Sequence, residues 1–258
     1  MSIQELDIPI PDVDIIFKKH EDQLSTTLRY DRFRTTESPD QWRFLLGPDV
    51  ILLTHPKVVA HIAEEFLAYE GATLTAEEEA LLSIAPWVHD LGELIINGDG
   101  IGDISFDQKT DAHETKELAV FTSVLTAIPD GDKKSAIERS YREIVMDRGS
   151  RLGKMFNAVE RIGYLQTAIR AYEGVEGQRI QNWKGLVGNV LSNQIIPMLA
   201  YCSEFPYVTN ILFEENRQII RAMFKDTEGN VPQDNTGKPS FDPEKLQRAF
   251  LAWKYMLE

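Results

Sequence analysis

Residues 54–68 read THPKVVAHIAEEFLA, and the apolar spacing in this stretch decides the fold class. Its stripe consists of His55, Val59, Ile62 and Phe66, at steps of four, three and four residues. This spacing places the stripe on one face of an α-helix, with His55 pointing toward the interior. His61 falls on another face, beside Glu64 and Glu65, and is predicted to be solvated.

The same three- and four-residue spacing recurs along the chain, whereas alternation of apolar and polar residues is scarce. The sequence therefore predicts an all-α fold. Thr75-Ala76-Glu77-Glu78 matches a capping box at the start of a helix. Pro86 lies within this helix and is expected to kink it. The predicted helices cover 13–28, 56–69, 75–89, 112–126, 133–147, 151–172, 182–201, 209–224 and a last segment from Pro243.

Three polar segments are predicted to lie outside helices. Residues 38–40 read as a polar turn, and 97–111, NGDGIGDISFDQKTD, as a long loop at the rim of a site. Residues 225–239, KDTEGNVPQDNTGKP, have the composition of a solvated loop without fixed structure.

Composition excludes several classes of protein. The 41 acidic residues outnumber the 27 basic ones, so the net charge of −14 argues against binding duplex nucleic acid. The longest apolar runs, such as Val50–Leu53, are far shorter than the ~18 residues that a membrane span needs. The single cysteine, Cys202, cannot form an intramolecular disulfide. The first residues are acidic, whereas a signal peptide begins with basic and then apolar residues. We expect a cytoplasmic protein with no membrane segment.

The dipeptide His89-Asp90 is the most informative feature for chemistry. The two side chains lie about 100° apart at the end of an apolar helix, so they can share one metal ion. A core histidine that bonds its neighbouring aspartate is the alternative. His55, the inward-facing histidine upstream, favours the metal interpretation.

Glu160 lies within KMFNAVERIGYLQTAIRAYE, on an otherwise apolar helix face. A buried carboxylate needs a partner, because an unpaired buried charge is costly. A metal ion is one candidate partner, and an internal salt bridge, for example with Arg161, is another.

Together these residues resemble the HD-domain metal-dependent phosphohydrolases, whose ordered pattern is H…HD…D on an all-α bundle. The resemblance is closest to the branch of 5′-deoxynucleotidases, because that branch has HDxxE followed by GD, and this chain has HDLGE at 89–93 and Gly98-Asp99. It implies an HD-domain helical bundle with a motif-bearing core at about 28–173. The whole chain, 1–258, is then one HD-like unit with a C-terminal helical extension at about 180–258.

The resemblance also implies a set of site residues. The implied metal ligands are His55, His89, Asp90 and Glu160. A mixed nitrogen and oxygen site suits one divalent ion of Mn, Co, Fe, Ni or Zn, with Mg as a further candidate. Glu160 departs from the family, which has aspartate there, and Asp147 and Asn157 are the nearby alternatives.

Catalysis and substrate binding are assigned by the same resemblance. Glu93 and Asp99 are the implied catalytic residues, although both also suit an ordinary polar turn. Arg29, Arg32 and Phe33 are the implied substrate-binding residues, because guanidinium groups bind phosphate in two places. The alternative is that Arg29, Arg32 and Arg34 form a solvated charge cluster without a role in binding. Lys109 and His113 are weaker phosphate candidates.

The expected activity is that of a metal-dependent phosphomonoesterase acting on nucleoside 5′-monophosphates or a related small phosphate. Two alternatives stay open. A non-catalytic nucleotide sensor would explain the departure at Glu160, and a di-iron oxygenase would need more histidines than His20, His61 and His113 supply. The expected partner is a small phosphorylated substrate, with a homodimer as an expectation by analogy.

Overall fold

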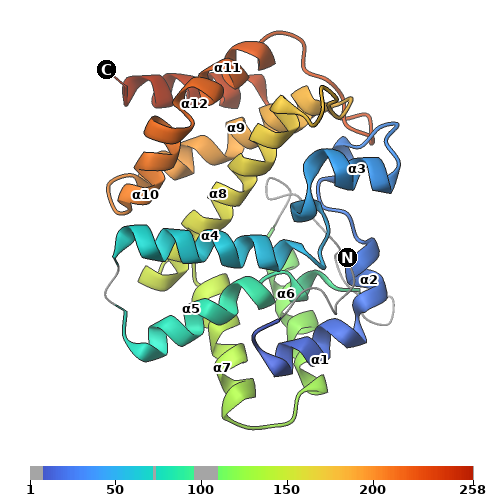
Figure 1. Cartoon of the computed structure of the whole chain (residues 1–258), viewed down its shortest axis with the longest axis vertical. Coiled ribbons are helices and arrows are strands. Elements are labelled where there is room, and N and C mark those ends of the chain that lie inside the picture. Colours follow the sequence, from blue (N-terminus) through green and yellow to red (C-terminus); the bar gives the residue numbers. More distant parts are fainter. Residues whose placement is uncertain (1–7, 72–73, 96–109, 258) are drawn as a thin grey trace. The chain divides into compact units, whose positions relative to one another are not determined.

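The computed structural model describes residues 8–71, 74–95 and 110–257, and the regular elements within these ranges are all helical (Figure 1). The predicted all-α class is confirmed, since this described part of the chain contains isolated bridges but no strand. The chain divides into two compact units. The first unit comprises Met1–Arg29 and Pro48–Asn157, and the second comprises Tyr30–Gly47 and Ala158–Glu258.

The first unit contains the dipeptide His89-Asp90 and the helices before and after it. Its α-helices are α1 (Pro11–Lys19), α2 (Glu21–Thr26), α4 (His55–Glu70), α5 (Ala76–Val88), α6 (Asp111–Val124) and α7 (Asp132–Ser140). Its short 3₁₀ and π elements are η3 (Pro48–Val50), η4 (Leu91–Glu93), η6 (Leu125–Ala127) and the π-helix η7 (Tyr141–Met146). Helix α8 (Arg151–Glu173) belongs to this unit as far as Asn157 and to the second unit from Ala158.

Helix α4 forms as its apolar spacing predicts. Val59, Ile62 and Phe66 are each at most 1% exposed, and His55 is also buried, so the stripe faces the interior. His61 is solvated as expected, with a side chain that is 70% exposed. Gly71 ends the helix in the left-handed conformation, with φ of 54°, which costs glycine little.

Helix α5 begins with the predicted capping box. The Thr75 hydroxyl accepts from the Glu78 amide, and the Glu78 carboxylate accepts from the Thr75 amide. Helix α5 packs against α4 and ends at Val88, so the end of one helix lies near the start of the other.

The core of the first unit joins α1, α5 and α6. Phe17 packs edge to face on Trp87 with ring centroids 6.5 Å apart. Phe121 stacks on Tyr141 at 3.7 Å with an interplanar angle of 9°. The contact of Trp87 with Phe17 holds the end of α5, which directly precedes His89-Asp90, within a core that also contains Phe121 and Tyr141.

The second unit is built around α9. Its elements are η2 (Asp31–Phe33), α3 (Pro39–Leu46), the rest of α8, α9 (Trp183–Tyr201), α10 (Pro206–Thr209), the π-helix η8 (Asn210–Glu215), α11 (Arg217–Thr227) and α12 (Pro243–Tyr255). Helices α11 and α12 both pack on α9, and Trp253 of α12 stacks on Phe213 at 6.2 Å. The predicted last helix is therefore used for packing within its own unit.

Two predictions of local structure were wrong. The helix expected at 13–28 is interrupted at His20, where the backbone leaves helical geometry at φ of −115° and ψ of 18°. The polar turn at 38–40 is the start of α3, because Ser38 forms a capping box with Gln41. Polar residues such as Ser38 and Asp40 suit both a turn and the start of a helix.

Of the predicted loop at 225–239, the first three residues belong to α11, and the rest is mostly exposed but has a defined conformation. Asp234 is buried, and its carboxylate accepts from the backbone amides of Thr236 and Lys238. The Asn235 amide donates to the Arg32 carbonyl at 2.8 Å. Side-chain acceptors thus stabilise a segment whose composition predicts disorder. Across the described ranges, none of the helices combines the length and apolar character needed to cross a membrane.

Candidate metal centre

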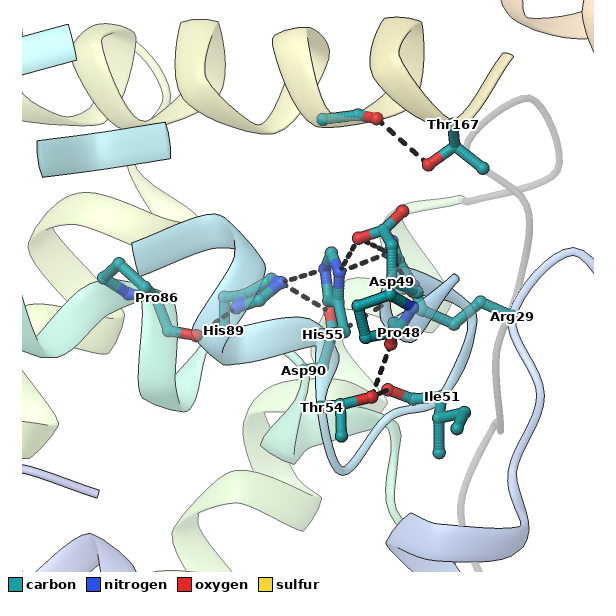
Figure 2. A network of polar contacts seen from close by, with 11 residues as sticks. Arg29, Pro48, Asp49, Ile51, Thr54, His55, Pro86, His89, Asp90 and Thr167 are labelled. Atoms are coloured by element: carbon teal, nitrogen blue, oxygen red, sulfur yellow. Dashed lines mark hydrogen bonds and ion pairs between the residues drawn. The ribbon is translucent and has the colours of Figure 1, made fainter. Parts of the chain in front are cut away.

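Two helix ends of the first unit bring His55, His89 and Asp90 together (Figure 2). His55 is the first residue of α4, and its amide donates to the Ile51 carbonyl at 2.9 Å. His89 is the C-cap of α5, and Asp90 follows directly. Three of the four predicted ligands therefore converge, and we call these three residues the ligand group.

The possible donor atoms of the ligand group face one another. Nε2 of His55 lies 2.9 Å from Nε2 of His89. Asp90 places Oδ1 at 3.2 Å from Nε2 of His89 and Oδ2 at 3.5 Å from Nε2 of His55. Both imidazoles are buried, with 4% of His55 and 6% of His89 exposed.

The orientation of His89 is set by the end of its own helix. The Pro86 carbonyl lies in the last turn of α5, where carbonyls lack partners within the helix. It lies 2.8 Å from Nδ1 of His89, and because a carbonyl only accepts, that nitrogen holds the proton. Nε2 of His89 therefore presents a lone pair toward His55.

His55 is held by two charged residues outside the ligand group. Its Nδ1 lies 2.6 Å from Oδ1 of Asp49 and 2.6 Å from Nη1 of Arg29. Asp49 requires a proton on Nδ1, whereas Arg29, which only donates, requires a lone pair there. The tautomer selected by Asp49 leaves Nε2 free to bind a metal. The tautomer selected by Arg29 places a proton between the two Nε2 atoms.

The surroundings of His55 keep its ring neutral. Burial lowers the pKa of His55, and the positive charge of Arg29 lowers it further, against the opposing effects of Asp49 and Asp90. A neutral imidazole is the form that binds a metal, so no proton has to be removed from an imidazolium at neutral pH.

The spacing of the donor atoms fits a transition metal. Bonds of about 2.0–2.2 Å place neighbouring ligands of a tetrahedral or octahedral ion about 3.0–3.5 Å apart. The two Nε2 atoms are 2.9 Å apart, Oδ1 of Asp90 lies 3.2 Å from His89 and Oδ2 lies 3.5 Å from His55, and one ligand atom from each residue lies within 4.8 Å of the other two. Three protein ligands leave coordination positions open, as in catalytic rather than structural sites. Among the described residues, this group is the one whose histidine and carboxylate atoms meet the spacing for a metal.

Glu93 is buried, and it lies close to His89 and Asp90 in the sequence. It lies in η4, three residues after Asp90, and is 6% exposed, so it is not a solvated turn carboxylate. Helix α6 packs on η4, and there is no room for a side chain at Gly92. A Cβ there would lie 2.4 Å from the Tyr141 hydroxyl and 2.8 Å from the Glu117 carbonyl.

Glu160 belongs to the second unit, while the ligand group belongs to the first. It is half-buried on α8, and its part in the centre stays a prediction. Of the two alternatives, Asp147 is an exposed turn residue whose Oδ1 accepts from the amides of Gly149 and Ser150. Asn157 is buried in the first unit.

Arg32 and Phe33 lie in the second unit and have packing contacts there. The Arg32 guanidinium lies 4.6 Å above the Phe33 ring, and its Nη2 donates to the Ser240 carbonyl at 3.2 Å. Phe33 is only 1% exposed. Arg34 is paired with Asp31 at 2.5 Å. A role of Arg32 and Phe33 in substrate binding stays a prediction.

The other predicted site residues are placed as follows. Asp99 and Lys109 lie outside the described residues. His113 is part of the start of α6, where its Nδ1 accepts from the Thr110 amide at 3.2 Å. Arg29, predicted to bind substrate, lies within hydrogen-bonding distance of His55.

Sequence reasoning missed Asp49. It lies in the short 3₁₀ element η3 and is buried, and it precedes His55 by six residues. No motif or periodicity marks it, and the only available signal was an acidic residue next to the apolar run at 50–53.

Comparison with family models, with curated proteins and with solved structures finds no match to this chain. Its function therefore has to be inferred from the chemistry of its own side chains.

Proposed function

We propose that this protein is a metal-dependent hydrolase of small phosphate esters, with nucleoside 5′-monophosphates as the first substrates to test. The observation that supports this most directly is the ligand group, in which two imidazoles and one carboxylate bring their possible ligand atoms close together. The ordered residues His55, His89-Asp90 and Glu93 match the HD phosphohydrolase pattern.

A divalent transition ion supplies, when bound, Lewis-acid polarisation of a phosphoryl oxygen and a lowered pKa for a coordinated water. The protein's own residues have separate tasks. In the tautomers selected by Asp49 and by the Pro86 carbonyl, the far nitrogens of the two imidazoles hold the protons, and both Nε2 atoms would be available to the ion. Glu93 is the candidate to accept the proton of the attacking water, because it is a buried carboxylate next to the motif.

Charge at the centre favours an anionic substrate. Asp49, Asp90 and Arg29, the charged side chains in contact with His55, together carry one net negative charge. A divalent ion reverses this to one net positive charge, which attracts phosphate. An acidic protein thus concentrates positive charge only where the reaction requires it.

The test uses purified protein stripped of metal with a chelator and then loaded with Mn, Co, Fe, Ni, Zn or Mg in turn. Phosphate release is measured on nucleoside 5′-monophosphates, nucleoside 3′-monophosphates and p-nitrophenyl phosphate. We expect release with at least one transition ion, and its loss in Asp90→Ala. Asp130→Ala is the matched control, because the Asp130 side chain is 96% exposed and pairs only with Lys134 in its own turn.

A silent panel with every ion would contradict the hydrolase. If nucleotide binding persisted in such a panel, measured by calorimetry, the nucleotide-sensor alternative would replace it.

A metal-dependent oxygenase is the second candidate. Two histidines and one carboxylate are also the ligand set of mononuclear Fe(II) oxygenases. Within the part of the chain that the structure describes, neither His20, His61 nor His113 joins a second group with metal-binding spacing, which a di-iron centre would need. Oxygen consumption by the Fe(II)-loaded protein, measured with an electrode against a panel of small phosphonates and polyols, distinguishes this candidate.

A further inference from the structure

Arg29 is a buried cation next to the ligand group. Only 6% of the residue is exposed, and its backbone is fixed because its amide donates to the Val50 carbonyl at 2.9 Å. The neighbouring bridge between Leu28 and Ile51 holds the same segment. The guanidinium also lies 3.4 Å from the Asp49 carbonyl through Nη1. Arg29 is therefore held in place at the centre.

The guanidinium contacts groups that a metal ion would also need. Its Nη1 lies 2.6 Å from Nδ1 of His55 and 3.6 Å from Oδ1 of Asp49. Its Nε lies 3.9 Å from Oδ2 of Asp90 (Figure 2). Arginine stays charged at any pH at which the protein is folded. The centre thus contains a permanent cation beside two carboxylates and one imidazole.

Metal binding would weaken the contacts of Arg29 with Asp90 and with His55. Coordination draws the negative charge of Asp90 toward the ion, and it requires the His55 tautomer whose Nδ1 proton faces Asp49. Nδ1 then no longer accepts from Arg29. Two positive charges a few ångströms apart in a buried site repel each other unless an anion lies between them.

We propose that Arg29 couples metal binding to oxyanion binding at this centre. Without metal, Arg29 neutralises Asp90 and Asp49 and opposes the entry of a divalent ion. With metal, its donors turn to a phosphate group that the ion and the guanidinium bind together. This rests on the ligand group of the proposed function but not on hydrolysis.

Coupling of this kind is reciprocal. If phosphate tightens metal binding by a given factor, the metal tightens phosphate binding by the same factor, and such factors are typically about 5–150. Removal of the guanidinium charge has two opposite consequences. Metal affinity without phosphate rises, because a competing cation is gone, and the effect of phosphate on metal affinity disappears.

The experiment measures Mn²⁺ dissociation constants by calorimetry on the chelator-stripped protein, with and without inorganic phosphate. Chloride keeps the ionic strength equal. The visible absorption of Co²⁺ reports imidazole coordination in parallel. In the wild-type protein, phosphate should lower the dissociation constant by at least about fivefold. In Arg29→Gln, the dissociation constant without phosphate should fall, by about tenfold if one charge contact is removed, and phosphate should change it by less than about twofold.

Arg142→Gln is the matched control, because Arg142 is 47% exposed and pairs with Glu138 one turn away. It should keep the wild-type coupling. Arg29→Met, also neutral and unbranched, serves if Arg29→Gln does not fold, as judged by thermal unfolding.

The proposal is overturned if phosphate leaves wild-type metal affinity unchanged, if the neutral variants keep the coupling, or if they weaken metal binding without phosphate. Its failure is distinct from failure of the hydrolase. If phosphate and metal binding are coupled but no phosphate ester is hydrolysed, this inference is supported and the hydrolase is contradicted. If esters are hydrolysed but the coupling is absent, only this inference is contradicted.

Discussion

Oδ1 of Asp49 lies 2.6 Å from Nδ1 of His55, across the ring from the nitrogen that faces His89. A carboxylate in this position fixes the tautomer and the direction of a metal-binding imidazole and makes the ring a stronger ligand. Asp49 is therefore part of the centre although it is no ligand itself.

The first prediction concerns this carboxylate. Asp49→Asn should raise the Co²⁺ dissociation constant about 10- to 100-fold, because the amide keeps the shape of the side chain but loses its charge. Calorimetry and the Co²⁺ absorption spectrum measure the change. Asp130→Asn, on the exposed surface, should bind Co²⁺ like the wild type. Equal affinity in Asp49→Asn would show that the contact does not orient His55.

The second prediction concerns the stability that a bound metal ion adds. Saturation at about 100 times the dissociation constant should stabilise the wild type by about 2.7 kcal/mol. In a chain of this size that raises Tm by roughly 5–10 °C. His55→Ala, His89→Ala and Asp90→Ala should show no such rise in a thermal shift measurement.

His61→Ala is the control for the second prediction, since His61 lies on the same helix as His55 but is 70% exposed. It should keep the full rise in Tm. A rise that survives Asp90→Ala would place the metal elsewhere in the molecule.

The third prediction concerns pH in the metal-free protein. The pKa of His55 is lowered below 6.5, first by burial and then by Arg29. The unfolded chain therefore binds a proton at a higher pH than the folded chain, so stability falls as pH drops through about 6.5 toward the folded pKa. The slope from this residue is at most about 1.4 kcal/mol per pH unit.

Urea denaturation between pH 7.5 and 5, with a chelator present, measures this slope. The pKa of His20 is lowered by burial and by Lys19, so it contributes in the same direction. His55→Gln should flatten the curve, and His20→Gln should flatten it further. A curve that keeps its full slope in His55→Gln would contradict the assignment of that residue.

The fourth prediction concerns Gly92. In Gly92→Ala the new Cβ would lie 2.4 Å from the Tyr141 hydroxyl and 2.8 Å from the Glu117 carbonyl. Overpacking of this kind typically costs about 1–3 kcal/mol. Because η4 starts directly after Asp90, metal affinity should fall as well. Urea denaturation and metal titration measure the two effects.

Gly149→Ala is the control, since a Cβ there meets only the Asp147 side chain, at 3.4 Å. Its stability should stay within about 0.5 kcal/mol of the wild type. Wild-type stability in Gly92→Ala would mean that η4 shifts freely, against the close packing observed.

Helices were predicted correctly where the apolar spacing of a single face defines them. The prediction failed where the interruption of a helix depends on contacts with other segments. The α4 stripe and the Thr75 capping box are local patterns, and both formed as expected. The interruption at His20 leaves no clear mark in the apolar spacing. The start of α3 at Ser38 used residues that favour turns and helix caps equally.

The sequence by itself determined the helical class and three of the proposed metal ligands, because helical spacing and the adjacency of His89 and Asp90 are properties of short segments. Only the tertiary structure decided which charges surround His55. Arg29 precedes it by 26 residues and reaches it because Leu28, shortly after α2, forms a backbone bridge with Ile51, directly after η3. Such a contact depends on how separate segments pack, and no periodicity within either segment encodes it.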